Sequence, residues 1–211
     1  MIESSNKPMV SKPHRKALLL SYFTVGYNVL EGGASIVAGS FSGSIALLGF
    51  GLDSFVESLS GCIMIWRFGQ QGRLSEVEEE RIEKRAAKAV AYTFFLLGAY
   101  VLYGSCRKLY LHEAVSPSLP GIVIAVISLV AMPILFYLKY KTGKSMNSKS
   151  LIADSKQTLT CMLMSAAVLL GLGLNYYYGL WQADPIAGLA IVLFLLGEGY
   201  ETLREGTSCD C

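Results

Sequence analysis

Six long apolar stretches run through most of this chain and are separated by short polar connections. A helix needs about 20 mostly apolar residues to cross a bilayer, and each stretch is close to that length. Their approximate bounds are residues 17–39, 44–66, 89–106, 118–138, 150–173 and 183–203. Charged residues make up only 16% of the 211 residues, whereas roughly 25% is usual in soluble domains. The sequence therefore predicts an all-α protein with six transmembrane helices and excludes a water-soluble globule.

The polar segments at the ends and between the stretches predict the domain organisation. We expect a cytoplasmic N-terminal segment at residues 1–16, a transmembrane domain at residues 17–204 and a short cytoplasmic tail at residues 205–211. No small-residue cleavage site follows the basic N-terminus, so the first span is expected to be retained. The mixed-charge sequence GRLSEVEEERIEKRAAK is expected to prolong the third helix into water. We expect no separate catalytic domain and no soluble C-terminal domain.

Basic residues are distributed unevenly between the two sides of the predicted bundle. Fifteen of the 18 Lys and Arg fall at the N-terminus, the second and fourth connections and the tail, whereas the opposite side has only Arg107 and Lys108. Lys139 is included here as part of the fourth connection, KYKTGKSMNSKS. Lys and Arg near span ends are retained in the cytoplasm. We therefore expect an inner (plasma) membrane protein with both termini cytoplasmic.

Net charge and cysteine content narrow the range of partners. A net charge of +2 is too balanced to indicate nucleic acid. Five cysteines at irregular spacing do not suggest a disulfide framework, and Cys62 and Cys106 are expected to be free packing residues. Cys209 and Cys211 leave open a second, two-thiol metal site in the tail.

Two acids interrupt the second apolar stretch. Asp53 and Glu57 are four residues apart, which places both carboxylates on one face of a helix, about 6 Å apart. A carboxylate near the centre of a span costs about 2.5 to 3.5 kcal/mol on insertion scales, and two of them repel unless a cation or a proton lies between them. The pair therefore indicates a cation site or a proton carrier. The alternative is that both acids hydrogen-bond to neighbouring helices.

The fifth stretch carries a matching pair, Gln157 and Cys161, also four residues apart. At about 1.5 Å per residue, both pairs fall at similar depths below the cytoplasmic ends of their helices. Four donors on two antiparallel helices suit a four-coordinate transition-metal ion. The alternatives are interhelical hydrogen bonding for Gln157 and plain packing for Cys161.

Other polar residues in the spans are secondary candidates. Asn28 of the first stretch falls near the same depth, either as a ligand or as an interhelical hydrogen-bonding residue. Asp154 lies nearer the cytoplasmic edge, as a ligand on the access path, a helix-end residue or a partner of Lys156. Interfacial or gating roles are expected for Glu31, Glu198 and Glu201.

Four passages carry a resemblance to a known family, and they are YNVLEG, GSIALLGFGLDSFVES, SLIADSKQTLTC and WQADPIAGLAIVL, in this order. With them, residues 15–204 resemble the transmembrane part of the cation diffusion facilitator (cation efflux) family, whose members export zinc and related divalent ions. The resemblance implies a six-helix bundle of cation-efflux type. Members usually continue into a small cytoplasmic α/β domain, but this chain ends seven residues after Arg204. Any homodimer is therefore expected to form through the membrane helices.

The resemblance also implies a ligand set. In the family, an acid pair on the second helix and a His/Asp pair on the fifth helix bind the ion. Asp53 and Glu57 match the first pair, whereas Gln157 stands where His or Asp is expected and Cys161 stands where Asp is expected. A thiolate favours softer ions, and imidazole is a good zinc ligand. The departure therefore leaves the transported ion open among Zn, Cd, Mn, Fe and Co.

We therefore expect a secondary transporter, not an enzyme, that exports a divalent transition-metal ion in exchange for protons. The protons would bind Asp53, Glu57 or Cys161, whose deprotonated forms bind metal. The expected partners are the metal ion, protons and the bilayer, with no resident cofactor. The alternative is a related membrane subunit or metal sensor that does not transport, which Gln157 and Cys161 favour. An intramembrane aspartyl protease is not indicated, because GFGLD places Leu52 between the glycine and the acid, unlike GxGD.

Overall fold

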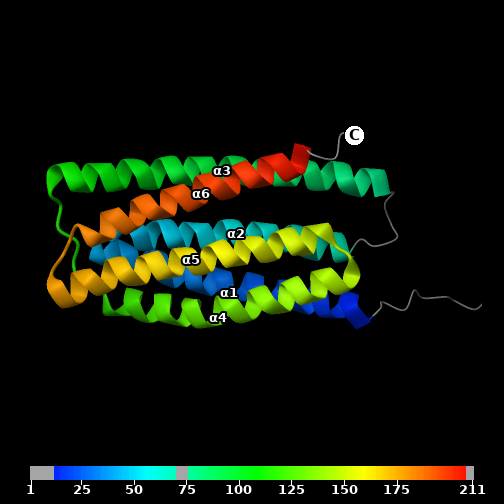
Figure 1. Ribbon diagram of the computed structural model, residues 1–211, viewed down its shortest axis with the longest axis horizontal. Coiled ribbons are helices and arrows are strands. Elements are labelled where there is room, and N and C mark those ends of the chain that lie inside the picture. Colours follow the sequence, from blue (N-terminus) through cyan, green and yellow to red (C-terminus); the bar gives the residue numbers. More distant parts are fainter. Residues whose placement is uncertain (1–11, 70–75, 208–211) are drawn as a thin grey trace, which may run out of the picture.

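The computed structural model describes residues 12–69 and 76–207, which form six helices and no strand. The helices are α1 (Lys12–Ser42), α2 (Ile45–Gly69), α3 (Glu76–Leu111), α4 (Leu119–Met146), α5 (Lys149–Tyr178) and α6 (Ala183–Thr207). Successive helices run in opposite directions along one elongated bundle (Figure 1). We call the end at which α1 begins and α6 ends the terminal end, and the opposite end the distal end. The predicted all-α bundle of six helices is confirmed within these residues.

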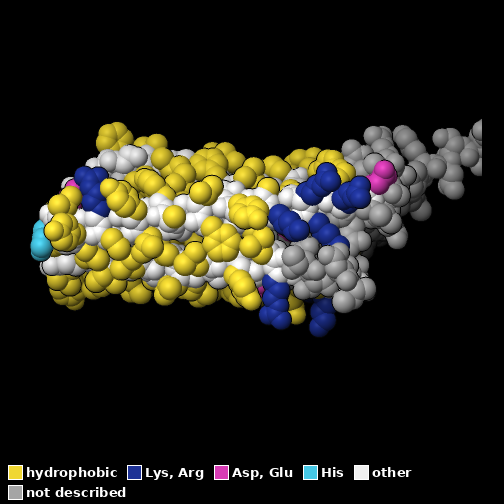
Figure 2. All heavy atoms as spheres, turned by 90° about the horizontal axis from the view of Figure 1, so that it is seen from above, with side chains coloured by type: hydrophobic (Ala, Val, Ile, Leu, Met, Phe, Trp, Pro, Cys, Tyr) yellow, Lys and Arg dark blue, Asp and Glu magenta, His cyan; other side chains and the backbone are white. Residues whose placement is uncertain are grey.

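Five of the six helices are long and apolar enough to cross a membrane. Their apolar segments are Ile45–Trp66, Lys84–Leu111, Leu119–Met146, Ser150–Tyr178 and Ala183–Arg204. On the face that Figure 2 shows, apolar side chains lie over the middle of the bundle, and Lys and Arg lie toward its two ends. The chain is therefore a multi-pass membrane protein. The predicted prolongation of the third helix is also present, because α3 is already helical from Glu76, ahead of its apolar segment.

α1 is the exception among the six helices. Buried polar residues recur along it at spacings of three and four, and they are Ser21, Thr24, Asn28, Glu31 and Ser35. This spacing puts them on one face of the helix, and they interrupt the apolar run of α1. α1 packs against α2 and α4, so neighbouring helices shield its polar face. The prediction of six helices is correct, but α1 is not one of the helices that length and apolarity identify as spans.

A buried acid, Asp184, ties the distal corner between α1 and α2 to the start of α6. Its carboxylate accepts hydrogen bonds from the Ser44 hydroxyl and from the Ile45 N–H, the latter at 3.0 Å. The Ser44 oxygen also accepts a bond from the Leu47 N–H at 3.0 Å, as a residue that caps a helix N-terminus does. Gly43 makes the corner with a φ of 70°, a conformation that glycine adopts without steric strain.

The α4–α5 connection is shorter than the sequence interpretation expected. Lys139 and the residues after it were predicted to form a loop, but α4 continues to Met146 and only Asn147 and Ser148 precede α5. Asn147 ends α4 with a φ of 51°, and the Ser148 side chain accepts a hydrogen bond from the Leu151 N–H at 3.4 Å. The longer helix makes Lys139 an interior residue of α4.

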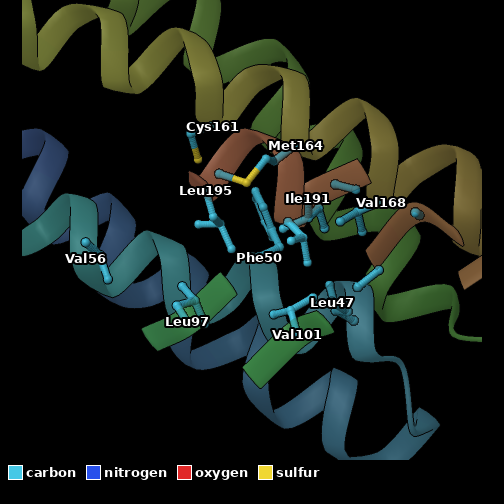
Figure 3. Close-up of a cluster of buried hydrophobic side chains, with 14 of the residues drawn as sticks. Leu47, Phe50, Val56, Leu97, Val101, Cys161, Met164, Val168, Ile191 and Leu195 are labelled. Carbon is cyan, nitrogen blue, oxygen red and sulfur yellow. The ribbon is translucent and has the colours of Figure 1, made fainter. Parts of the chain in front are cut away.

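An apolar core is shared by α2, α3, α4, α5 and α6, and Figure 3 labels side chains of α2, α3, α5 and α6 that belong to it. Its completely buried side chains include Leu47, Phe50, Val101, Val168, Ile191 and Leu195. Cys161 belongs to the same cluster. Its thiol therefore borders apolar side chains on one side.

Small residues bring α1 and α2 together. A Cβ added at Gly32 would lie 2.8 Å from the Gly51 carbonyl oxygen, and one added at Gly51 would lie 3.0 Å from that of Gly32. The two backbones are therefore in contact, as is common between membrane helices with small residues at their interface. These two glycines of the first two helices pack within the chain and leave no close-approach surface for a second copy at that point.

Candidate functional site

Asp53 and Glu57 lie inside the bundle on the membrane-length part of α2. Asp53 exposes 3% of its surface and Glu57 exposes none. The two carboxylates are close enough to interact electrostatically. Because like charges repel strongly where little water screens them, this pair requires a nearby cation or bound protons.

The cation that faces Glu57 is Lys139 of α4, which is completely buried. Its Nζ lies 3.6 Å from Glu57 Oε1 and 2.9 Å from Asp154 Oδ2. The same ammonium donates a hydrogen bond to Thr158 Oγ1 at 2.9 Å, and the Thr158 hydroxyl donates to Glu57 Oε1 at 2.6 Å. One ammonium therefore bridges an acid on α2 and an acid on α5.

The sequence interpretation missed Lys139 because the residues around it are typical of a loop. A signal was nevertheless present in the helical period. The buried positions of α4 recur every three or four residues and include Gly121, Ala125, Ser128, Met132, Leu135, Lys139 and Thr142. Continuing the period of the apolar stretch past its end would have placed Lys139 on the inward face.

Asp154 of α5 belongs to the same cluster and is also buried. Besides its contact with Lys139, it accepts a hydrogen bond from the Ser60 hydroxyl of α2 at 3.3 Å. Lys156, which was one of its expected partners, instead pairs with Glu201 at 2.8 Å, where both side chains are half exposed. Counted along α5 from its first residue, Asp154 lies about 8 Å from the terminal end, at 1.5 Å per residue.

Cys161 lies about 18 Å along the same helix and is brought near the acid pair. It is buried, and it interacts with both Asp53 and Glu57. Gln157 is only partly buried, and its Nε2 has no hydrogen-bond partner among the described residues. Glu57 instead reaches Thr158, the next residue along α5.

Asn28 of α1 is completely buried, and neither of its amide atoms has a hydrogen-bond partner within the part of the chain that the structure describes. In this conformation it therefore does not act as an interhelical hydrogen-bonding residue. A buried amide without partners is unusual, because an unpaired buried polar group destabilises a fold. The Asn28 side chain is thus available to a ligand or to water.

Glu31 was expected at the membrane interface or at a gate, and its burial excludes the interfacial position. It lies in the interior with 6% of its surface exposed. The Tyr27 hydroxyl donates to its Oε1 at 2.9 Å, and the Ser54 hydroxyl lies 3.1 Å from its Oε2. Its charge acts on both Asp53 and Glu57. α1 therefore adds a third acid to the region around the pair.

Glu198 and Glu201 of α6 lie at the edge of this region. Glu198 is partly buried, accepts a hydrogen bond from the Thr160 hydroxyl and acts electrostatically on Asp53. Glu201 is exposed, in agreement with an interfacial position.

The candidate ligands are gathered in one region without closing around a common point. Within residues 12–69 and 76–207, no group of three His, Cys, Asp and Glu side chains is arranged to hold a metal ion. Cys62 and Cys106 are free thiols on the surface, and the proposed Cys209 and Cys211 site lies outside the described residues. The acids and Cys161 would need to move closer together to bind one ion.

Known proteins provide an independent comparison. A family model described as the cation efflux transmembrane domain matches residues 22–209. Transmembrane protein 163 of Xenopus laevis is 23% identical over 217 residues, which covers 97% of this chain and 73% of that protein. The cation-efflux pump FieF of Salmonella typhi is 26% identical over 174 residues, which covers 81% of this chain and 57% of the pump.

A further relative is the cadmium, cobalt and zinc/H(+)-K(+) antiporter of Bacillus subtilis (strain 168). It is 21% identical over 197 residues, which covers 91% of this chain and 62% of the antiporter. The chain therefore spans between 57% and 73% of the length of these three relatives.

Proposed function

The chain belongs to the cation efflux family, and we propose that it is a secondary transporter that exports a divalent transition-metal ion from the cytoplasm in exchange for protons. The observation that supports this most strongly is the acid pair Asp53 and Glu57, buried within a helix long and apolar enough to cross a membrane. Each acid costs about 2.5 to 3.5 kcal/mol at the centre of a span. Acids retained there at that cost are suited to binding a cation or carrying a proton.

In this proposal the ion is held between α2 and α5. Asp53, Glu57 and Cys161 would supply two carboxylates and a thiolate, and Gln157 would supply an amide oxygen. Oxygen and sulfur ligands together suit Zn²⁺ and the softer Cd²⁺ better than Mg²⁺ or Ca²⁺. The name of the Bacillus subtilis relative, a cadmium, cobalt and zinc/H(+)-K(+) antiporter, supports the same class of ion. Asn28 is a further candidate ligand from α1, because its buried amide has no partner among the described residues.

We place the cytoplasm at the terminal end of the bundle. On the face shown in Figure 2, more Lys and Arg gather toward that end than toward the distal end, and basic residues near span ends are retained in the cytoplasm. Both chain ends would then be cytoplasmic in a plasma membrane. Asp154 lies nearer the terminal end than the proposed ligands Gln157 and Cys161 on the same helix. An ion that enters from the cytoplasm would therefore pass Asp154 first.

Protons and the metal ion would compete for the same atoms, since carboxylates and thiolates bind metal in their deprotonated forms. α2 packs on α1 and α5 packs on α4, so the two ligand-bearing helices belong to different helix pairs. Rocking of these pairs would expose the site to the opposite side. There, protonation of Asp53 and Glu57 would weaken binding and release the ion.

The test is metal flux in proteoliposomes, measured across a panel of Zn²⁺, Cd²⁺, Mn²⁺, Fe²⁺ and Co²⁺ with and without a pH gradient. The wild type is expected to move at least one ion, and collapse of the gradient is expected to slow it. Asp53→Asn is expected to lower the flux by about 100-fold or more. Glu113→Gln is the matched control, because Glu113 is a partly exposed acid outside the candidate site and pairs with Arg107 at 3.0 Å. Flux in Asp53→Asn equal to that of the wild type would refute transport through this site.

A metal sensor or a subunit that does not transport is the second candidate. Gln157 and Cys161 at the α5 positions favour it, as does the open arrangement of the candidate ligands among the described residues. Saturable Zn²⁺ binding that depends on Asp53, without flux of any ion in the panel, would select this candidate.

A further inference from the structure

Lys139 carries its positive charge to the point where two acids of the proposed pathway meet. The residue belongs to α4, but the acids belong to α2 and α5. Its whole side chain is buried, and lysine is almost never fully buried unless it is paired. The ammonium therefore occupies the space between Glu57 and Asp154 in the conformation that the structure shows.

The pairing is incomplete in its hydrogen bonds. Glu57 Oε1 lies 3.6 Å from Nζ, beyond hydrogen-bonding distance, and Glu57 Oε2 has no partner among the described residues. Asp154 Oδ2 lies 2.9 Å from Nζ, but the contact is not aligned as a hydrogen bond. Lys139 thus balances the two carboxylates by charge, and Glu57 Oε2 is left available to another ligand.

The position of the ammonium is also on the proposed route of the ion. Lys139 lies about 10 Å from Met146, the last residue of α4, at 1.5 Å per residue. It therefore lies between the terminal end and Asp53, at the level where an ion from that end would meet Asp154 and then Glu57. A divalent ion and an ammonium cannot share this space, because like charges at such distances repel.

On the basis of the proposed function, we propose that Lys139 is a tethered cation that occupies the Glu57–Asp154 cluster in the empty protein and is displaced when a divalent ion binds. This competition lowers the affinity for the metal and so favours its release. It also selects by charge. A monovalent ion offers the acids no more charge than the ammonium it would replace, whereas a divalent ion offers twice as much.

The test compares Lys139→Met with the wild type, using purified full-length protein and Zn²⁺ or K⁺ alone as the probe. Methionine keeps much of the length of the side chain and removes its charge. We expect Zn²⁺ to bind about tenfold more tightly and K⁺ to compete with Zn²⁺ in the variant but not in the wild type. Lys141→Met is the matched control, because Lys141 is exposed on the same helix, and it is expected to bind Zn²⁺ like the wild type.

Zn²⁺ binding by folded Lys139→Met that equals or falls below that of the wild type would overturn the proposal. If this variant does not fold, Thr158→Val decides, because it removes the hydroxyl that holds the ammonium against Glu57. This second variant is expected to bind Zn²⁺ about threefold more tightly, and unchanged or weaker binding would again overturn the proposal. If the wild type moves no ion in the flux assay but the differences in Zn²⁺ binding are still found, the proposed transport is refuted and displacement of Lys139 is supported.

Discussion

The bundle buries acids in two regions and satisfies them in different ways. At the distal corner, Asp184 accepts hydrogen bonds on both oxygens from the neutral donors Ser44 and Ile45. In the middle of the bundle and toward the terminal end, Glu57 and Asp154 face the ammonium of Lys139, and each keeps an oxygen without a hydrogen bond among the described residues. Burial alone does not separate a structural acid from a candidate ligand. The two regions differ in what faces the carboxylates, which is a set of neutral donors around Asp184 and the ammonium of Lys139 between Glu57 and Asp154.

The largest expected effect on stability is at the distal corner. Asp184→Ala leaves the Ser44 hydroxyl and the Ile45 N–H without their acceptor, so the free energy of unfolding is expected to fall by about 2 to 4 kcal/mol. Unfolding in a titration with SDS measures the change. Glu113→Ala removes an acid from an exposed ion pair and is expected to change this free energy by less than about 0.5 kcal/mol. A similarly small change in Asp184→Ala would contradict its structural role.

Unlike Asp184→Ala, Glu57→Gln is expected to lower metal flux strongly and to change the free energy of unfolding little. The glutamine keeps an oxygen that can accept from Thr158, and Lys139 keeps its contact with Asp154, so the free energy of unfolding is expected to change by less than about 1 kcal/mol. Metal flux is expected to fall by about 100-fold, which corresponds to about 2.7 kcal/mol. Measuring flux and unfolding on the same preparation separates the two regions. Loss of stability as large as that in Asp184→Ala would show that both acids are structural.

Charged residues within an apolar stretch could be predicted from the sequence as candidate site residues. Asp53 and Glu57 stand out because they interrupt an apolar run, and the structure finds both buried on α2. The helix count follows from the same apolar runs. Polar residues at the ends of runs were harder to place, because their composition is the same whether they face water or protein.

Lys139 and Glu31 illustrate why the burial and the partners of the other polar residues in the site could not be predicted from the sequence. Lys139 has the same surroundings in the sequence as Lys141, and only the helical register sends the first inward and the second outward. Glu31 belongs to a helix whose polar face is covered by α2 and α4, so its burial depends on how distant segments pack. The partnership of Lys139 with Asp154 also joins two helices, and no local pattern specifies it.

The next largest expected effect is a change of metal preference on substitution of Cys161, which lies between the acid pair and the apolar core. Cys161→Asp exchanges a soft ligand for a hard one, so the ratio of Cd²⁺ to Zn²⁺ affinity is expected to fall about tenfold. Competition between the two ions for the purified protein measures the ratio. Cys161→Ser removes the thiol without adding a carboxylate and is expected to weaken mainly Cd²⁺ binding. An unchanged ratio in both variants would assign Cys161 to the apolar core alone.

The smallest effect on stability is expected when Glu31 loses one of its hydrogen-bond donors. Glu31 combines features of both regions, because it lies near the acid pair but accepts hydrogen bonds from neutral hydroxyls. The Ser54 hydroxyl lies 3.1 Å from both Glu31 Oε2 and the Phe50 carbonyl oxygen. Ser54→Ala removes this donor, and the free energy of unfolding is expected to fall by about 1 kcal/mol, with flux nearly unchanged. Ser58→Ala is the matched control, because its hydroxyl donates to the Ser54 carbonyl at 2.9 Å, and its expected effect is below about 0.5 kcal/mol. If Ser54→Ala instead lowers flux by more than about tenfold, Glu31 belongs with the candidate ligands, and neutral donors on both oxygens are not enough to make a buried acid structural.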